Sequence, residues 1–596
     1  MREKFRTWNR EKVIGIFLLA FALIGPLVIH QNYIIHLMVM CAIYAGLACS
    51  MNIILGYTGL FSLAHAAFWG IGAYTSGILV GKLGFPIWVG VLLSGVVACI
   101  FGMIIAIPSL NLRGDYLAIV TLGFGQIVRL IELNEQWLTN GAMGITAIPK
   151  PALFGIKFGR VQFFYLALAI TLLVMLVIYR LVKSRVGRAL IAIREDDLAA
   201  MAIGVNVRNY KILAFGIGTF CAGLMGSVYA HYITFISPDQ YTFQISVNIF
   251  CMVILGGMGT TIGPVLGAIV LTLLPEVMRT FDVYRMIIVG LLMVLCMIFR
   301  PQGIIGSYVV GGTSIWDTLS KKRKRDSKEV GEMSVILRAE HVCKAFGGVK
   351  ALNDVSFEIR EGEIIGLIGP NGAGKTTMFN IIAGVYPATS GNVEFLGKNI
   401  NTVPTHNRVK MGMARTFQNI KLFSNVSALE NVLAGCHNWS KSQWLPIILG
   451  LPKIKEDERR SREYSLQMLE FVNLIEKKDV FARNLPYGEQ RSLEIARALA
   501  AKPKVLLLDE PAAGMNEVEK DALQILVADI REKLKITVLI IEHDMKVIMN
   551  LCDRINVLAQ GEKICEGSPQ TVRQDPKVIE AYLGSAMGRR DRFVKN

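Results

Sequence analysis

Several features that would assign this chain to a soluble or secreted class are missing. Its ten cysteines form no C-x-x-C pair and no cysteine–histidine cluster, so the sequence predicts free thiols rather than disulfides or a metal site. No motif combines aromatic and basic residues, and nucleic acid is therefore not expected as a partner, despite the formal net charge of +17. No small-residue cleavage site follows the first apolar run, 13–29, which favours a retained membrane span.

Charged residues are also scarce in the first half of the chain. Before residue 305, runs of roughly 17–25 apolar residues recur, which is the length that crosses a ~30 Å hydrocarbon core. After residue 334 these runs disappear, although the mean hydropathy of all 596 residues is still +0.46. The basic excess is then explained by Lys and Arg that flank spans and face membrane lipid.

Apolar segments in this half are candidate membrane spans. They are 13–29, 34–55, 61–80, 87–107, 116–133, 163–182, 212–233, 246–274 and 287–299. Basic residues gather at 2–12, 180–211 and 321–325, and the positive-inside bias places all three clusters in the cytoplasm. Because an even number of crossings must follow the second cluster, 246–274 is predicted to be a broken hairpin. Glycine-rich interruptions at 55–62 and 255–264 indicate either a translocation path or close helix packing through small residues.

The second half contains a phosphate-binding loop. Gly369-Pro370-Asn371-Gly372-Ala373-Gly374-Lys375-Thr376-Thr377 lies between a strand-like run, 363–368, and a predicted helix, 377–383, as the G-x-x-x-x-G-K-[ST] motif requires. The three glycines free backbone N–H groups to face phosphate oxygens. Lys375 is predicted to reach the β- and γ-phosphates, and the Thr376 hydroxyl is predicted to ligate Mg²⁺.

Two further strands end in chemically useful side chains. The apolar run 504–508 leads to Asp509, which is predicted to hold Mg²⁺, and to Glu510, which is predicted to orient the attacking water. The run 537–541 leads to His543, which is expected to face the γ-phosphate. An ATPase on the same chain as membrane spans predicts ATP-driven transport.

The segment 484–499 resembles the L-S-G-G-Q signature of ABC ATPases, which caps the ATP of a partner in a head-to-tail dimer. The residues in trans contact by this match are Pro486, Tyr487, Gly488, Glu489 and Gln490. The resemblance also implies Gln418 as the Q-loop residue and a Mg²⁺ ligand, Phe346 as the aromatic that stacks on adenine, His543 as the switch histidine and 513–516 as the D-loop. Pro486 stands where the family has serine, and Asn516 where it has aspartate. Residues 334–584 look closest to the LivG-type ATPase of branched-chain amino-acid importers.

The membrane half is similar to the LivM-type permease of the same importers. The resemblance is carried by 62–68, 112–122 and 255–267, and it covers nearly all of 10–305. Between spans, 184–204 is predicted to be an amphipathic helix that ends in glycine. ABC importer permeases carry an E-A-A-x-x-x-G loop that docks on the ATPase. Ala199, Ala200 and Gly204 fit this pattern, with Leu198 in place of Glu.

The predicted fold class is a polytopic all-α membrane domain, with about 8–10 spans or broken spans, fused to an α/β P-loop ABC ATPase with a helical subdomain. The expected boundaries are 1–310 for the permease, 311–333 for a polybasic cytoplasmic linker, 334–584 for the ATPase and 585–596 for a basic tail.

The resemblance implies ATP-driven import of branched-chain or related hydrophobic amino acids across the cell (inner) membrane, with ATP and Mg²⁺ as cofactors and the ATPase in the cytoplasm. A second permease, a second ATPase and an extracytoplasmic substrate-binding protein are the implied partners. Import of urea or another small amide is the alternative within the family. An ABC exporter is also compatible with the permease-first order, although the helix interruptions and the importer-type loop disfavour it.

Overall fold

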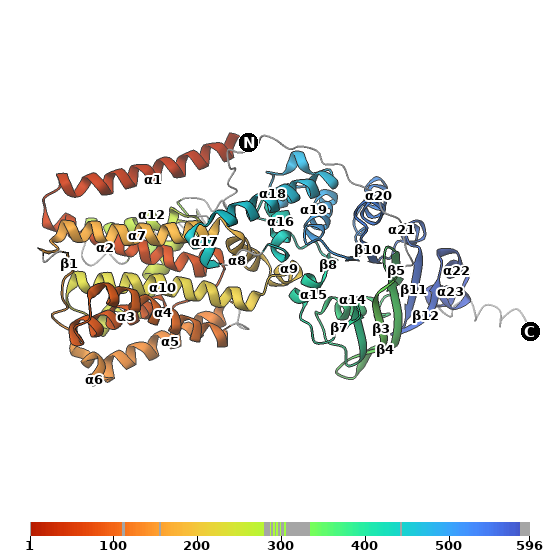
Figure 1. Cartoon of the computed structure of the whole chain (residues 1–596), viewed down its shortest axis with the longest axis horizontal. Helices are drawn as coiled ribbons and strands as arrows, with labels where there is room; N and C mark the ends of the chain where they lie inside the picture. Colours follow the sequence, from red (N-terminus) through yellow and green to blue (C-terminus); the bar gives the residue numbers. More distant parts are fainter. Residues whose placement is uncertain are drawn as a thin grey trace, which may run out of the picture. The chain divides into compact units, whose positions relative to one another are not determined.

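The chain forms two compact units that exchange short segments (Figure 1). The computed structural model describes residues 2–109, 114–153, 156–278, 334–440 and 444–583, with isolated positions between 287 and 304. One unit comprises Met1–Glu195, Val207–Val310 and Gln443–Leu451, and the other comprises Asp196–Asn206, Gly311–Ser442 and Pro452–Asn596. The linker predicted at 311–333, the tail at 585–596 and about half of the span at 287–299 lie outside the described residues.

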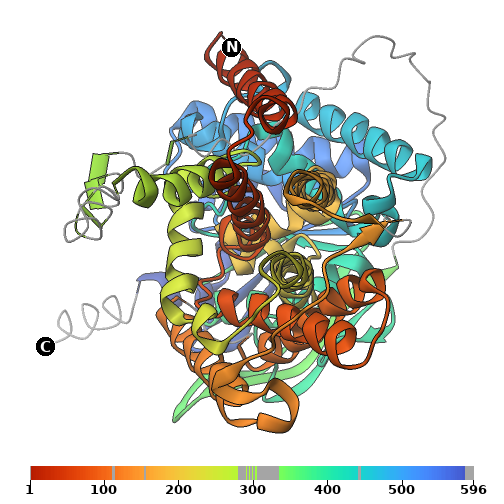
Figure 2. The same cartoon turned by 90° about the vertical axis from the view of Figure 1, so that its left-hand side faces the viewer.

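Long apolar helices build the first unit. Within the described residues, five helices are long and apolar enough to cross a membrane. They are α2 (Asn32–Asn52) with its π-helical extension η1 (Ile53–Tyr57), α4 (Ile87–Ser109), α5 (Asp115–Asn134), α7 (Arg160–Val182) and α10 (Val207–Ile233). The largely buried α10 packs against α2, α4 and the shorter α3 (His65–Ser76), and it therefore forms the centre of the unit. Figure 2 views these helices from one end.

The remaining predicted spans are shorter or interrupted. The first corresponds to α1 (Arg2–Val28), whereas the span predicted at 61–80 begins as helix only at α3 and continues into the π-helix η2 (Gly77–Lys82). The segment 246–274 is a helical hairpin of α11 (Phe243–Gly256) and α12 (Gly263–Val277). A Cβ on Gly256 would lie 1.9 Å from the Gly263 carbonyl oxygen, and one on Gly267 would lie 1.9 Å from that of Met252. The antiparallel pairing confirms the predicted broken hairpin.

The two glycine-rich interruptions pack against one another. The Asn52 side chain donates to the Thr260 carbonyl at 2.9 Å and accepts from the Gly259 N–H at 2.9 Å. A Cβ on Gly56 would lie 2.5 Å from the Gly259 nitrogen, so no larger residue fits there. Arg194 also donates to the Gly56 carbonyl at 2.7 Å. Close packing, one of the two interpretations that the sequence left open, therefore accounts for these glycines.

The prediction of a single amphipathic helix at 184–204 is wrong, because the segment forms two helices. These are α8 (Arg185–Glu195) and α9 (Asp197–Ala202), and the break falls at Asp196. Asp196 adopts an extended backbone and caps α9 by accepting from the Ala199 N–H at 2.8 Å. An aspartate side chain that binds the backbone in this way starts a new helix. Gly204 ends the segment, as predicted, with φ at +89°.

The second unit is an α/β ATPase fold. Its six-stranded sheet has the order β12-β11-β5-β10-β9-β8, with all neighbours parallel except β12, and a four-stranded antiparallel sheet has the order β4-β3-β6-β7. The bounds are β3 (Val335–Phe346), β4 (Val349–Arg360), β5 (Ile364–Ile368), β6 (Ser390–Phe395), β7 (Lys398–Asn399), β8 (Met413–Arg415), β9 (Val505–Asp509), β10 (Thr537–Ile541), β11 (Arg554–Ala559) and β12 (Glu562–Gly567). Strands β5, β9 and β10 are buried along their whole length, which explains their continuous apolar sequences.

Helices complete each unit. A helical subdomain is formed by α16 (Ala428–Gly435), α18 (Pro452–Phe471) and α19 (Tyr487–Leu499), which pack together beside the sheet. By contrast, α17 (Trp444–Leu449) belongs to the first unit, where Arg180 of α7 donates to the Ile448 carbonyl at 2.7 Å. The ATPase sequence therefore contributes one helix to the helical unit, which the sequence analysis did not predict.

Candidate ATPase site

The phosphate loop connects β5 to α14 (Lys375–Ala383), which begins two residues before the predicted start. Gly369, Gly372 and Gly374 all have positive φ, at +152°, +82° and +96°. A Cβ on Gly369 would lie 2.0 Å from the carbonyl oxygen of Leu558. A Cβ on Gly374 would lie 2.6 Å from the carbonyl oxygen of Ala351. Only glycine fits these two positions, and the resulting loop precedes the N-terminus of a helix, where backbone N–H groups bind phosphate.

Lys375 lies folded over this loop. Its Nζ donates to the carbonyl of Gly369 at 2.7 Å and to that of Pro370 at 3.0 Å. Burial lowers the pKa of the Lys375 ammonium, although the nearby Glu510 carboxylate acts against this effect. Thr376 and Thr377 follow in the first turn of α14, and Asn371 lies within the loop itself. The motif residues therefore lie together in the loop and the first turn of α14.

Two other predicted site residues, His543 and Gln418, meet at Glu510. His543 Nε2 lies 2.7 Å from Glu510 Oε1, and Gln418 Nε2 donates to Glu510 Oε2 at 3.0 Å. Glu510 has φ at +46°, in the left-handed region, and its N–H donates to the Ile541 carbonyl at 2.9 Å. This strained backbone, which costs about 1–3 kcal/mol, aims the carboxylate from the end of β9 toward the end of β10.

Asp509 is buried beside an arginine that the sequence analysis missed. Asp509 is 2% exposed, and its Oδ1 has no hydrogen-bond partner among the described residues. Oδ2 lies 3.7 Å from the guanidinium of Arg415, which is on the neighbouring strand β8. Burial raises the pKa of Asp509 to about 6, although Arg415 acts against it. The sequence feature that could have indicated this arginine is a basic residue in a short apolar run just before Gln418.

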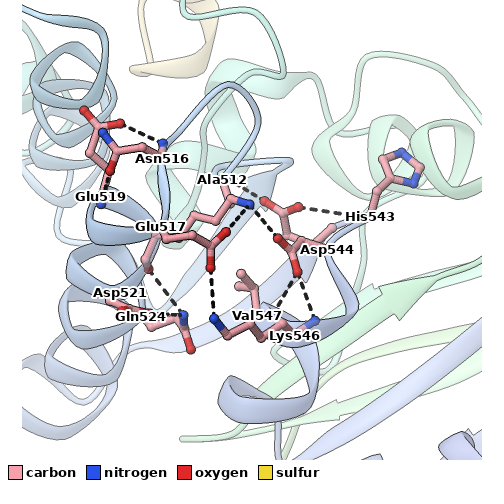
Figure 3. A network of polar contacts seen from close by, with 12 residues as sticks. Ala512, Asn516, Glu517, Glu519, Asp521, Gln524, His543, Asp544, Lys546 and Val547 are labelled. Atoms are coloured by element: carbon pink, nitrogen blue, oxygen red, sulfur yellow. Dashed lines mark hydrogen bonds and ion pairs between the residues drawn. The ribbon is translucent and has the colours of Figure 1, made fainter.

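A polar network ties the His543 loop to the D-loop (Figure 3). Glu542 accepts from the backbone N–H of Ala512 at 2.5 Å and of His543 at 3.1 Å. Asp544 caps α21 (Met545–Leu551) and pairs with Lys520 at 2.8 Å. The segment that follows Glu510 is therefore fixed relative to His543. The role of Glu542 was not predicted, because it depends on the pairing of β9 with β10.

Asn516, which replaces the D-loop aspartate, serves as a helix cap. Its side chain accepts from the Glu519 N–H at 2.9 Å, and the Glu519 carboxylate accepts from the Asn516 N–H at 3.0 Å, so that α20 (Glu517–Leu534) begins with a capping box. An asparagine performs this task as well as an aspartate does.

The signature segment opens α19 with Pro486 as its N-cap, which supplies no side-chain oxygen. A Cβ on Gly514 would lie 3.2 Å from the Tyr487 ring. A Cβ on Gly488 would lie 2.6 Å from the Glu519 carboxylate. Glu489 pairs with Lys477, and Gln490 donates to the Leu485 carbonyl at 2.8 Å. The signature therefore contacts the D-loop region of its own chain.

Phe346 lies apart from these groups, at the end of β3. Its ring is 45% exposed and makes an edge contact with Tyr386, with the centroids 5.5 Å apart. An exposed ring at this edge is compatible with the predicted stacking on adenine, which stays a prediction.

The predicted coupling residues belong to the ATPase unit. Ala199 and Ala200 are fully buried, and a Cβ on Gly204 would lie 3.5 Å from both Val409 and Asn438. Lys421 Nζ pairs with Asp196 at 2.7 Å.

Hydrogen bonds continue from Lys421 to the signature helix. The Lys421 N–H donates to Glu494 at 3.2 Å, and Arg491 of α19 pairs with Glu494 at 2.9 Å. Arg491 also donates to the carbonyls of Phe417 and Gln418, at 2.6 Å and 2.8 Å. The segment 196–206, the Q-loop and the signature helix thus form one continuous network.

Lys421→Met is expected to weaken coupling while nucleotide binding is kept. The substitution removes the pair with Asp196, which is partly exposed and contributes less than about 1 kcal/mol, so we expect transport per ATP hydrolysed to fall roughly twofold to fivefold. Uptake and phosphate release, measured in the same vesicles, give this ratio. Lys453→Met, on the exposed side of α18, is the matched control and should keep the ratio. An unchanged ratio in Lys421→Met would remove the pair from the coupling network.

A parallel sheet that ends in a phosphate loop, an Asp-Glu pair and a histidine, with a helical subdomain that carries the signature, defines an ABC-type ATP hydrolase. Its fusion to apolar membrane helices defines a membrane-embedded ABC transport protein.

Comparisons with known proteins agree for both halves. Residues 33–297 match the family described as the permease component of branched-chain amino acid transport systems. Residues 352–513 match the ABC transporter family, and 562–587 match the branched-chain amino acid ATP-binding cassette transporter family.

Named relatives cover the two halves separately. The high-affinity branched-chain amino acid transport ATP-binding protein BraF of Pseudomonas aeruginosa is 43% identical over 42% of this chain and 98% of its own length. The corresponding LivG of Escherichia coli is 40% identical over 42% and 98%. The permease protein LivM of Escherichia coli is 38% identical over 50% of this chain and 75% of its own length. The chain therefore belongs to the branched-chain amino acid ABC transporter family, with the permease and the ATP-binding protein fused in one polypeptide.

Proposed function

We propose that this chain is the fused permease and ATPase subunit of an importer that moves branched-chain amino acids across the cell (inner) membrane. The observation that carries the proposal is that its two halves are similar to two components of the same kind of amino-acid transport system. The ATPase unit, with the basic clusters at the ends of the spans, lies in the cytoplasm.

The residues of the site fit Mg²⁺. Thr376, Asp509 and Gln418 would hold the ion, because their oxygens are ligands that Mg²⁺ prefers. Asp509 Oδ1 is buried without a partner among the described residues, and Gln418 uses its Nε2 toward Glu510, which leaves its amide oxygen available. The ion supplies charge neutralisation at the β- and γ-phosphates when bound. Because binding requires ionised Asp509, affinity for Mg²⁺ falls as the pH drops toward the raised pKa of about 6.

Hydrolysis follows from the orientation of Glu510. Both of its oxygens are engaged, by His543 and by Gln418, so the carboxylate is fixed and can align a water with the γ-phosphate. A change at Gln418 on nucleotide binding passes through Arg491 and Lys421 to the segment 196–206. At the preceding helix α8, Arg194 holds the carbonyl of Gly56, where the two glycine interruptions meet. ATP-driven movement of the segment thereby reaches the membrane helices, as a shift between two states.

The assembly contains a second permease, a second ATPase and an extracytoplasmic substrate-binding protein. A different ATPase partner is favoured by Pro486, since this signature lacks the serine hydroxyl that would donate to the γ-phosphate. In a heterodimer, the site built on the phosphate loop of this chain receives a complete signature from the partner. The opposite site lacks one charge-assisted hydrogen bond, a deficit of about 1.5–3 kcal/mol.

Lys375→Ala is expected to reduce uptake more than replacement of the equivalent lysine in the partner ATPase does. The site that contains Lys375 is the complete one, whereas the opposite site lacks one hydrogen bond. Inactivation of the complete site should therefore lower uptake roughly tenfold more than inactivation of the opposite site. Uptake by both single variants, in one reconstituted assembly, gives the comparison. Equal losses would mean that backbone N–H groups near Gly488 compensate fully. Uptake by this chain without another ATPase would remove the need for a different partner.

Competition for uptake tests the substrate class. Proteoliposomes that contain the complete assembly and its binding protein should accumulate L-leucine, and excess L-isoleucine or L-valine should compete with it. Urea should not compete. Urea accumulation without leucine accumulation would replace this substrate class with the small-amide alternative.

A further inference from the structure

The membrane unit contains a buried carboxylate that has no hydrogen-bond partner among the described residues. Glu132 is on the apolar helix α5, its side chain is 4% exposed, and neither carboxylate oxygen has a hydrogen-bond partner among the described residues. Arg129, one turn earlier on the same helix, pairs with Asp239 at 3.1 Å. An ionisable side chain in a membrane helix is costly to retain, and such residues mark pathways for substrates or ions.

A group of aromatic side chains lies beside this carboxylate. The Cβ position of Gly70 on α3 lies 2.8 Å from Glu132 Oε1 and 2.9 Å from Cγ of Tyr241, so the carboxylate and the Tyr241 ring meet over a glycine. The Trp69 and Tyr74 rings contact Tyr241 edge-on, with centroids 5.0 Å and 6.0 Å away. We call Glu132, Trp69, Tyr74 and Tyr241 the Glu132 cluster.

The polar atoms of the aromatic members are also unsatisfied. The hydroxyls of Tyr74 and Tyr241 and the indole nitrogen of Trp69 are buried without hydrogen-bond partners among the described residues. Buried polar groups are normally paired, because leaving one unpaired costs about 1–3 kcal/mol. Four neighbouring side chains that all break this rule indicate a site that is completed by a ligand.

The chemistry of the Glu132 cluster specifies a cation. A carboxylate supplies charge and strong acceptors, and aromatic faces attract an ammonium group by cation–π interaction. The unused hydroxyl and indole donors suit an anionic oxygen at the other end of the same ligand. A zwitterionic amino acid carries both groups.

The position of the Glu132 cluster suits an entry site. Glu132 is close to the C-terminal end of α5, and the chain then passes through α6 (Gln136–Thr139) and β1 (Ala152–Leu153) before α7 returns to α8. Figure 1 shows α6 and β1 at the end of the helical unit opposite α8. The segment that follows α8 is the coupling segment, so Glu132 lies toward the extracytoplasmic end, where imported cargo enters first.

We infer that the Glu132 cluster binds the ammonium group of the transported amino acid, with Glu132 as the counter-charge. The inference rests on the proposed import function and names the residues that recognise its substrate inside the membrane unit.

Glu132→Gln tests this assignment by removing the charge and keeping the shape. In proteoliposomes of the complete assembly, we expect L-leucine uptake to fall at least about tenfold, as the loss of a charge-assisted contact implies. Glu135→Gln is the matched control, because Glu135 lies three residues later, is exposed and pairs only locally with the indole of Trp137 at 2.7 Å. Uptake by Glu132→Gln equal to that of the wild type, while the wild type imports leucine, would overturn the inference alone.

Direct binding separates recognition from a structural role. Isopentylamine keeps the ammonium of leucine without its carboxylate, and 4-methylpentanoate keeps the carboxylate without the ammonium. We expect isopentylamine to raise the thermal unfolding midpoint of the purified wild-type chain, 4-methylpentanoate to shift it less, and the amine to have no effect on Glu132→Gln. An equal amine-induced shift in Glu132→Gln and wild type would overturn the inference, even if the variant had lost uptake. This measurement does not involve transport. It therefore tests binding at the Glu132 cluster independently of whether the assembly imports leucine.

Discussion

Glu510→Gln is expected to retain ATP binding and to lower ATP turnover at least about a hundredfold, because the attacking water loses its orienting carboxylate. The amide has the shape of the carboxylate and can still contact His543 or Gln418, so the fold at the end of β9 should be kept. Binding of a fluorescent ATP analogue and release of phosphate by the complete assembly measure the two steps separately.

Lys375→Ala is the matched comparison for this experiment. Its Nζ lies within the phosphate loop, so the substitution should weaken nucleotide binding itself rather than the later step. Near-normal ATP hydrolysis in Glu510→Gln would contradict the assignment of Glu510 and, with it, the role of the contacts from His543 and Gln418.

Gly204→Arg is expected to abolish uptake while membrane insertion and ATP binding persist. Gly204 has φ at +89°, and its Cβ position is already 3.5 Å from Val409 and Asn438, so a long charged side chain must displace the segment 196–206 from these two residues. We expect uptake below about a tenth of the wild-type rate, since a charged group cannot be buried in this contact without a partner. Gly204→Ala, which adds only a methyl group in ordinary contact, should have a smaller effect that arises from the positive φ.

Cysteine labelling tests the topology that this prediction assumes. Ala200 is buried and belongs to the ATPase unit, so Ala200→Cys should be reached only by reagents that enter the cytoplasm. Labelling exclusively from the extracytoplasmic side would refute both the topology and the coupling role.

The sequence predicts the nucleotide site well because its residues are encoded in local motifs. Strands β5, β9 and β10 are buried on both faces, so they appear as continuous apolar runs, and the functional residues follow directly at their ends. That His543 and Gln418 meet at Glu510 depends on the strand order β10-β9-β8, which the local motifs do not contain.

The missed features depend on contacts between distant segments. Asp196 interrupts a helical pattern that continues on both sides, because its side chain caps α9 and pairs with Lys421, which is 225 residues later. Arg415 and Glu542 act on residues at the end of the neighbouring strand β9, which the sequence does not place beside them. The burial of Glu132 likewise depends on Gly70 of another helix. The packing of α17 in the helical unit cannot be inferred from periodicity, since a short apolar helix fits either unit.

The most direct test of the central claim is to measure vectorial leucine transport and ATP hydrolysis together. Proteoliposomes should carry the complete assembly with its ATPase units facing the external medium and the substrate-binding protein in the lumen. With labelled L-leucine inside, addition of ATP and Mg²⁺ outside should drive leucine from the side of the binding protein to the side of the ATPase, and Glu510→Gln should stop this movement. ATP-dependent movement of leucine into the lumen, or the same flux with Glu510→Gln, would contradict an importer that is powered by this chain.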